Sequence, residues 1–269
     1  PQESQNWTWT NVIDLAKRLT KSDGSQYGLF VNQVSVPAFS GGAYWVNDRA
    51  NATRGALDDP RWARAMELWV DWTQKQKVVP LGSQARELGE ANMTEAWARG
   101  KVAMLQNQSP QIRFALIAEP SLQWDMIWVP KMANDLPRKF FSSGAGWGMT
   151  PQVRNADLAW EWIKFIDRKP GSYEINLKHN PPQAIYLSSH IPTTQKELKR
   201  LKEMGVVNAD LLVAGANDLY WTPLHAEWPR IESTIINPEL NKMQRGEVVP
   251  AGGLKDLNER VTRELQAGA

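Results

Sequence analysis

Cysteine is absent from this chain of 269 residues. Without thiols the protein can form no disulfide, no thiolate metal site and no cysteine nucleophile. Long apolar runs are absent too, because Val12–Leu19 and Leu211–Ala214 are far shorter than a membrane span. Pro1 opens directly into a polar stretch, so we expect any signal peptide to have been removed or to lie upstream.

An excess of one charge sign is also lacking. Lys and Arg together number 31 and Asp and Glu 29, and the two signs are mixed along the chain. No block of basic residues marks a nucleic-acid tract, so we expect no nucleic-acid partner.

Catalytic motifs are missing as well. The three histidines are scattered and have no metal-ligand spacing: His179, His190 and His225. Neither a G-x-S-x-G elbow nor a phosphate-binding Walker loop occurs. The glycines of 144–148 lack the third glycine of a dinucleotide fingerprint, because Met149 stands there. We therefore expect no cofactor and no enzyme. Counting carboxylates does not exclude a glycosidase pair, but Glu227 fits better as a first-turn charge of a helix.

Tryptophan, in contrast, is abundant, with 14 residues against 5 Tyr and 6 Phe. Indoles offer wide apolar faces on which the C–H face of a sugar ring can stack. Most of them should still be core, and helical spacing with apolar neighbours assigns five to the interior: Trp62, Trp69, Trp97, Trp160 and Trp162.

Helix-like and strand-like segments alternate, which favours an α/β fold. Helices are predicted at Trp9–Leu19 (with Thr10 or Asn11 as the cap), from Pro60 to Thr73, and at Glu87–Arg99, Asp157–Ile166, Gln195–Glu203, Trp228–Gln244 (with a break at Pro238) and Leu254–Leu265. Strands are predicted at Tyr27–Val31, Lys101–Leu105 and Trp124–Val129. Irregular segments are predicted at Val36–Asp48, the Gly- and Ser-rich Phe140–Thr150 and Pro181–Pro192.

Several segments, in order, resemble the extracellular solute-binding proteins of ABC sugar importers, the family that contains maltose-binding protein. Glu95–Met104 (EAWARGKVAM) is similar to that family's F-x-x-G-K-x-A-M stretch. Ser143–Met149 (SGAGWGM) followed by Asn155–Ile166 (NADLAWEWIKFI) is similar to its G-G-x-G-W-x-I … A-W-E-F-I-K-F pattern. The matches extend over nearly the whole chain.

The resemblance implies a two-lobe periplasmic binding protein fold of type II. Residues 1–136 would begin the second lobe, 137–191 would be a return segment of the first lobe, and 192–269 would close the second lobe. It also implies a monomer in the periplasm or outside the cell, either free or lipid-anchored through the missing N-terminal part, that takes a carbohydrate to ABC transporter permease subunits.

The sequence departs from the family pattern in two places. Most of the first-lobe sheet is absent, because Trp9 stands where family members are already in the second lobe. The aromatic residue that often follows K-V-A-M is replaced by Asn107 and Gln108, which leaves the identity of the ligand open.

Candidate ligand contacts lie in the loops that should line the cleft between the lobes. Aromatic faces and amide groups are the surfaces that a sugar needs. The candidates are Tyr44, Trp45, Asn107, Gln108, Ser143, Gly144, Gly146, Trp147, Tyr220 and Trp221, with Asn32 and Gln33 as weaker ones. For each, the alternative is an ordinary packing or turn role.

Two other functions fit the same residues. A carbohydrate-active enzyme or a lectin-like module would use the same indoles, and turnover of an oligosaccharide would identify the enzyme. A solute sensor that passes its ligand to a receptor would use the same fold as a transport protein.

Overall fold

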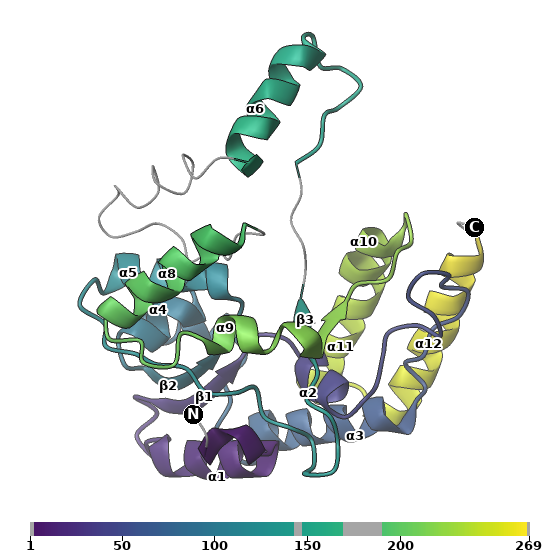
Figure 1. Cartoon of the computed structure of the whole chain (residues 1–269). Helices are drawn as coiled ribbons and strands as arrows, with labels where there is room; N and C mark the ends of the chain where they lie inside the picture. The colour runs from purple at the N-terminus through teal and green to yellow at the C-terminus, as the bar shows by residue number, and fades with distance from the viewer. Residues whose placement is uncertain (1–2, 143–146, 169–189, 268–269) are drawn as a thin grey trace.

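The structure is a computed structural model that describes residues 3–142, 147–168 and 190–267. Figure 1 shows helices surrounding two small parallel sheets. In one sheet, β1 (Tyr27–Val31) pairs with β2 (Val102–Gln106), with Leu29 opposite Met104. In the other, β3 (Phe140–Ser142) pairs with β4 (Leu219–Trp221). The predicted α/β class and the two first predicted strands are confirmed.

Helix α1 (Trp9–Leu19) has the predicted bounds, after a short 3-10 turn η1 (Glu3–Asn6). Its cap is Thr8 rather than Thr10 or Asn11, because the Asn11 side chain reaches back and accepts a hydrogen bond from the Thr8 backbone N–H at 2.8 Å. The helix packs on β1 so closely that a Cβ built on Gly28 would lie 2.0 Å from the Ala16 carbonyl oxygen. A glycine is therefore required at this contact.

The segment predicted to be irregular at Val36–Asp48 begins as a helix, α2 (Ser35–Ser40), all of whose residues are buried. Pro37 sits in the first turn, where the missing N–H costs no hydrogen bond. The helix ends at Gly41, and Gly42 turns the chain with φ of +83°.

Helix α3 (Pro60–Val70) starts at Pro60 as predicted, with the Asp59 side chain accepting from the Arg61 N–H at 2.9 Å. It continues into the π-helical turn η2 (Asp71–Lys75). Trp62 and Trp69 are fully buried, which confirms their assignment to the core.

The helix predicted at Glu87–Arg99 is shorter, because α4 spans only Met93–Ala98. Gly89 has φ of +77°, and Asn92 caps the helix by accepting from the Thr94 and Glu95 N–H groups, so the residues before it turn instead. Two short 3-10 turns, η3 (Gly82–Ala85) and η4 (Ser109–Gln111), and a helix that was not predicted, α5 (Ile112–Ala118), flank this region.

The strand predicted at Trp124–Val129 is not formed, since these residues pair with no strand in the described chain. Just after these residues, Lys131 forms an isolated bridge with Thr8. Arg138 links the same two parts of the chain, because its side chain donates to the Val129 carbonyl at 2.7 Å and to the Gln5 carbonyl. The prediction of a strand was therefore wrong, although exposed and half-buried residues alternate along 124–128 as they do in extended backbone.

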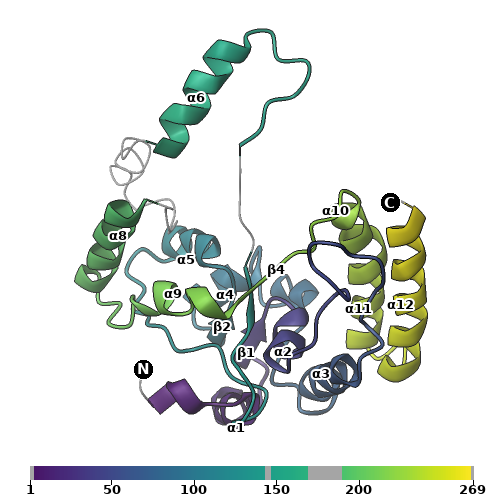
Figure 2. The same ribbon diagram turned by 45° about the vertical axis from the view of Figure 1, so that its right-hand side comes forward.

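Helix α6 (Ala156–Arg168) contains the predicted segment Asp157–Ile166 and stands apart from the other helices in both views (Figures 1 and 2). The core assignment of Trp160 and Trp162 was wrong, because both side chains are exposed. Trp97, assigned to the core as well, is half-buried.

The C-terminal third is helical. Helix α8 (Ile191–Glu203) begins four residues before the predicted start, with Pro192 in its first turn. It is followed by α9 (Leu211–Ala214) and the 3-10 turn η5 (Ala216–Asp218), and then by β4. Glu227 directly precedes α10 (Trp228–Ile231) and pairs with Arg230 at 2.7 Å.

The helix predicted at Trp228–Gln244 runs on through Pro238 instead of breaking. A π-helical turn, η6 (Glu232–Ile236), joins α10 to α11 (Asn237–Gln244), which places Pro238 in a first turn. Helix α12 (Pro250–Ala267) closes the chain and contains the predicted final helix. None of the described helices is long and apolar enough to cross a membrane.

The largest core cluster joins α2, α3, α10, α11 and α12, with Trp45, Trp62 and Trp228 among its buried members. A second cluster joins α1, β1 and the end of α3 around Trp9, Trp69 and Trp72. Together they fix the loop between α2 and α3 against β4, where the aromatic candidates lie.

Candidate functional site

An aromatic surface forms where the loop after α2 meets β4. The rings of Tyr44 and Tyr220 are in contact, with centroids 4.9 Å apart and planes tilted by 33°. The ring of Tyr220 also contacts that of Phe39, with centroids 4.3 Å apart. Tyr44 is 40% exposed, whereas Tyr220 is only 7% exposed. The outer ring is thus available to a ligand while the inner ring holds it in place.

The phenol of Tyr220 accepts a hydrogen bond from the Trp45 backbone N–H at 3.3 Å. Burial raises the pKa of Tyr220 to about 12, so the phenol stays neutral at physiological pH. Trp45 itself is 2% exposed and packs on Trp62 at 4.6 Å. It therefore supports the surface from beneath.

Trp221 extends the same surface. It follows Tyr220 in β4, is 40% exposed, and lies opposite Ser142 in the register of β3 with β4. Three of the candidates, Ser143, Gly144 and Gly146, lie outside the described residues. Trp147 is described and is 64% exposed.

The amide candidates form a second group, where the parallel strands β1 and β2 end. Asn107 is already engaged, because its amide N–H donates to the Thr94 hydroxyl at 2.9 Å and its oxygen accepts from the Gln108 N–H at 2.8 Å. Within the described chain, the side chain of Gln108 has no such partner, so it is the freer of the two. Asn32 is exposed beside them, and its backbone N–H donates to the Gln106 carbonyl at 3.1 Å. Gln33 follows it and is half-buried.

Helix α2 connects the two groups, because it follows β1 directly and ends at the Gly41–Gly42 turn before Tyr44. Phe39 of α2 also contacts Tyr220 of β4, with ring centroids 4.3 Å apart. The predicted contacts therefore fall into two sets, and α2 lies between them in the chain. The aromatic set is joined by several contacts. Tyr44 contacts the ring of Tyr220, the Trp45 N–H donates to the Tyr220 hydroxyl, and Trp221 follows Tyr220 in β4.

Charged residues at the edge of the aromatic surface were not predicted. Arg49 donates to the Thr222 carbonyl at 3.1 Å, directly after Trp221. Arg61 donates to Asp59 at 2.9 Å, and its hydrogen bond lowers the pKa of Asp59 and raises its own. Pro60 predicted only the start of a helix, and no sequence pattern predicted that the Arg61 side chain would lie beside Gly42, before Tyr44.

The family model for bacterial extracellular solute-binding proteins matches residues 2–170. The chain belongs to the bacterial extracellular solute-binding protein family. A search of curated proteins gives no significant match.

Solved structures agree with this family in fold. An ABC substrate-binding protein from Listeria monocytogenes, in complex with cycloalternan, has a TM-score of 0.69 at 17% identity over 96% of this chain and 64% of its own. The maltose/maltodextrin-binding domain MalE from Bdellovibrio bacteriovorus, bound to maltotriose, has a TM-score of 0.75 at 11% identity over 97% of this chain and 67% of its own. An ABC transporter solute-binding protein from Agrobacterium radiobacter, in complex with ribitol, has a TM-score of 0.64 at 17% identity over 97% and 64%.

This solute-binding protein therefore spans about two thirds of the length of the solved structures that it resembles. The match confirms the predicted family and the partial binding-protein fold. The family binds solutes and does not catalyse a reaction, which agrees with the expectation that the chain is no enzyme. The three-part division at 137 and 192 stays a prediction.

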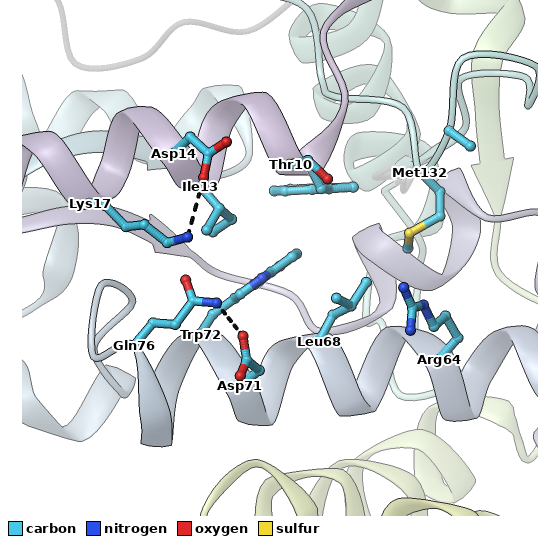
Figure 3. A pocket seen from close by; sticks show the side chains of 12 residues that line it. Thr10, Ile13, Asp14, Lys17, Arg64, Leu68, Asp71, Trp72, Gln76 and Met132 are labelled. Carbon is cyan, nitrogen blue, oxygen red and sulfur yellow. Dashed lines mark hydrogen bonds and ion pairs between the residues drawn. The ribbon is translucent and has the colours of Figure 1, made fainter.

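A separate cavity of about 340 Å³ lies between α1 and α3, away from the aromatic surface (Figure 3). Its base is the pair Trp9 and Trp72, whose rings are 5.4 Å apart but almost fully buried, and Asp14 pairs with Lys17 at its rim at 3.2 Å. Buried indoles present too little face for stacking, so the cavity is the weaker candidate for a ligand. No cluster of His, Cys, Asp or Glu that could hold a metal ion occurs among the described residues.

Proposed function

We propose that the complete protein captures a sugar or a related polyol outside the cytoplasm and delivers it to the permease subunits of an ABC transporter. Family membership supports solute binding. The carbohydrate class is supported by the solved relatives, which hold cycloalternan, maltotriose and ribitol.

The observation that carries this proposal is the aromatic surface of Tyr44, Tyr220 and Trp221. A pyranose ring has an apolar C–H face and a rim of hydroxyls. The exposed rings of Tyr44 and Trp221 suit the face, and the nearby guanidinium groups of Arg49 and Arg61 suit the hydroxyls, since charged donors make stronger hydrogen bonds.

The second group at the ends of β1 and β2 would hold the other side of a ligand that lies along α2. Gln108 offers both a donor and an acceptor to a hydroxyl. An amide here in place of an aromatic ring favours a ligand with many hydroxyls over one with a long apolar face. A polyol or a small sugar is therefore as suitable as an oligosaccharide.

Titration of the complete gene product with maltotriose, cycloalternan, tagatose and ribitol, by calorimetry, tests the proposal. We expect saturable binding of at least one of them. Trp221→Ala should weaken it by about tenfold or more, which is roughly 1.4 kcal/mol. Trp160→Ala is the matched control, because this exposed indole lies on α6 and outside the aromatic surface. The affinity of the Trp160→Ala variant for the same ligand should change by less than about twofold.

Two results would contradict the proposal. One is the absence of binding across a broad panel of sugars and polyols. The other is chemical conversion of a bound oligosaccharide, detected by mass spectrometry, since that would make the protein an enzyme. Delivery is tested separately, as stimulation of ATP hydrolysis when the loaded protein is added to its transporter in vesicles.

A further inference from the structure

The cavity between α1 and α3 does not suit a stacked sugar ring, but it has an apolar middle and a polar group at each end. Ile13, Leu68 and Trp72 line the middle. Figure 3 shows Arg64 at one end and Gln76 at the other. Both follow one another along α3 and η2, so their Cα atoms should be roughly 15–18 Å apart. The cavity is therefore elongated, with a volume of about 340 Å³.

At the Gln76 end, a hydrogen-bond acceptor lacks a donor. The Oε1 atom of Gln76 is buried and has no hydrogen-bond partner within the described chain, while its Nε2 donates to Asp71. Asp71 also pairs with Lys75 at 3.9 Å. Asp14, at the rim, pairs with Lys17 at 3.2 Å. Both carboxylates thus have cationic partners already, and a neutral donor such as a hydroxyl suits the remaining acceptor.

At the opposite end, the cavity offers a cation. Arg64 is exposed and forms no ion pair with any residue in the described part of the chain. Its guanidinium lies beside Met132 in Figure 3. A guanidinium presents its donors in a planar fork that matches the two oxygens of a carboxylate. A carboxylate bound there places the rest of its molecule along Leu68 and Trp72.

We propose that this cavity binds a small organic acid that has an apolar body and a hydroxyl at the end opposite its carboxylate. The carboxylate accepts hydrogen bonds from Arg64, and the hydroxyl donates to the Gln76 oxygen. The apolar body lies against Ile13, Leu68 and Trp72. The inference goes beyond the proposed function, because it assigns a second ligand of another chemical class to a separate cavity.

The acids para-hydroxyphenylpropanoate and phenylpropanoate test the proposal, since they differ only in the hydroxyl. Binding to the complete gene product is followed by NMR of the indole N–H signals. The signal of Trp72 is the one that Trp72→Phe removes. We expect this signal to shift in a saturable way, with a dissociation constant of about 1 mM or lower for the hydroxy acid. Phenylpropanoate should bind about fivefold more weakly, because it lacks the hydrogen bond to Gln76.

Two substitutions test the two ends separately. Arg64→Met should weaken the binding of both acids about tenfold, because the charge-assisted hydrogen bonds to the carboxylate are lost. Arg18→Met is the matched control, since Arg18 is exposed on α1 and does not line the cavity, and it should change binding by less than about twofold. Gln76→Met should reduce the fivefold preference for the hydroxy acid to less than about twofold. This ratio compares two ligands on one variant, so a general loss of stability does not mimic it.

Four results would overturn the proposal. Absence of a saturable shift with either acid would mean that water satisfies the Gln76 oxygen. Equal binding of the two acids would mean that the hydroxyl is not recognised. Equally tight binding of tyramine, which carries an ammonium instead of the carboxylate, would exclude the role of Arg64. Loss of acid binding in Trp221→Ala would place the acid on the aromatic surface. None of these results bears on sugar binding, which is measured with other ligands.

Discussion

Two tyrosines in contact have opposite roles at the candidate site. Tyr44 is half exposed and offers its ring to solvent, whereas Tyr220 is buried and fixes the backbone of Trp45. The sequence placed both in the same candidate set, because each stands in a loop-like context beside a tryptophan. Burial alone distinguishes the exposed candidate from the supporting ring beneath it, and burial depends on the α2 helix that the sequence did not predict.

The raised pKa of Tyr220 makes stability depend on alkaline pH. The folded phenol keeps its proton up to about pH 12, while the unfolded one loses it near its ordinary value of about 10. Between these pH values the folded state binds more protons, so the free energy of unfolding should fall by up to about 1.4 kcal/mol per pH unit. Tyr220→Phe should remove this part of the slope.

Urea denaturation at pH 9, 10 and 11 measures the effect as the difference in the free energy of unfolding between the original protein and the variant. The contribution of lysine titration cancels in this difference, because both proteins have the same lysines. At neutral pH, Tyr220→Phe should also cost about 1–3 kcal/mol, because the buried Trp45 N–H loses its acceptor. Tyr44→Phe is the control, with a change within about 0.5 kcal/mol. A variant with an unchanged alkaline slope would show that Tyr220 does not titrate as proposed.

At the scale of elements, the contact between α1 and β1 depends on Gly28. A Cβ there would lie 2.0 Å from the Ala16 carbonyl oxygen, and backbone cannot move aside as a flexible side chain can. Gly28→Ala should lower the free energy of unfolding by about 3 kcal/mol. Gly82→Ala, where a Cβ meets nothing within 4 Å, should change it by less than about 0.5 kcal/mol. A small effect of Gly28→Ala in chemical denaturation would mean that α1 can shift on the sheet.

Elements whose signals are local were predicted well. The bounds of α1 and β1 follow from apolar spacing, and α3 starts at Pro60 as predicted. Errors arose where distant contacts decide. Residues Trp124–Val129 have a strand composition but no strand beside them, and Trp162 lies on an apolar helix face that no described residues cover. A periodic pattern indicates which face of a helix is apolar, but it does not show what packs against that face.

At the scale of the whole molecule, the order of motifs identified the family where no single motif would have done so. The candidate site was only partly predictable. Tyr44, Tyr220 and Trp221 come together because β4 pairs with β3 and packs near α2, contacts between residues about 80 to 180 positions apart. Arg61 lies in the first turn of α3, which places its side chain beside Gly42, and no local sequence pattern indicates this contact. Long-range contacts of this kind are set by the fold and not by neighbouring sequence.

The partial coverage of the fold has a consequence for affinity. In a two-lobe protein the ligand is held from both sides, and closure excludes water from the hydrogen bonds. If the remaining lobe lies outside this chain, the 269-residue chain holds only one side of the ligand. Its dissociation constant for the best sugar or polyol should then be at least about 100-fold higher than that of the complete gene product, roughly 2.7 kcal/mol.

Calorimetry on both proteins under one buffer condition measures this ratio, and Trp221→Ala provides the internal control. If the two sides contribute independently, the substitution should weaken binding by a similar factor in each protein, because distant contacts are nearly additive. Equal affinities of the two unsubstituted proteins would contradict the prediction, since they would place all of the ligand's contacts on the present chain. In that case the aromatic surface of Tyr44, Tyr220 and Trp221, with its polar neighbours, would be the complete site.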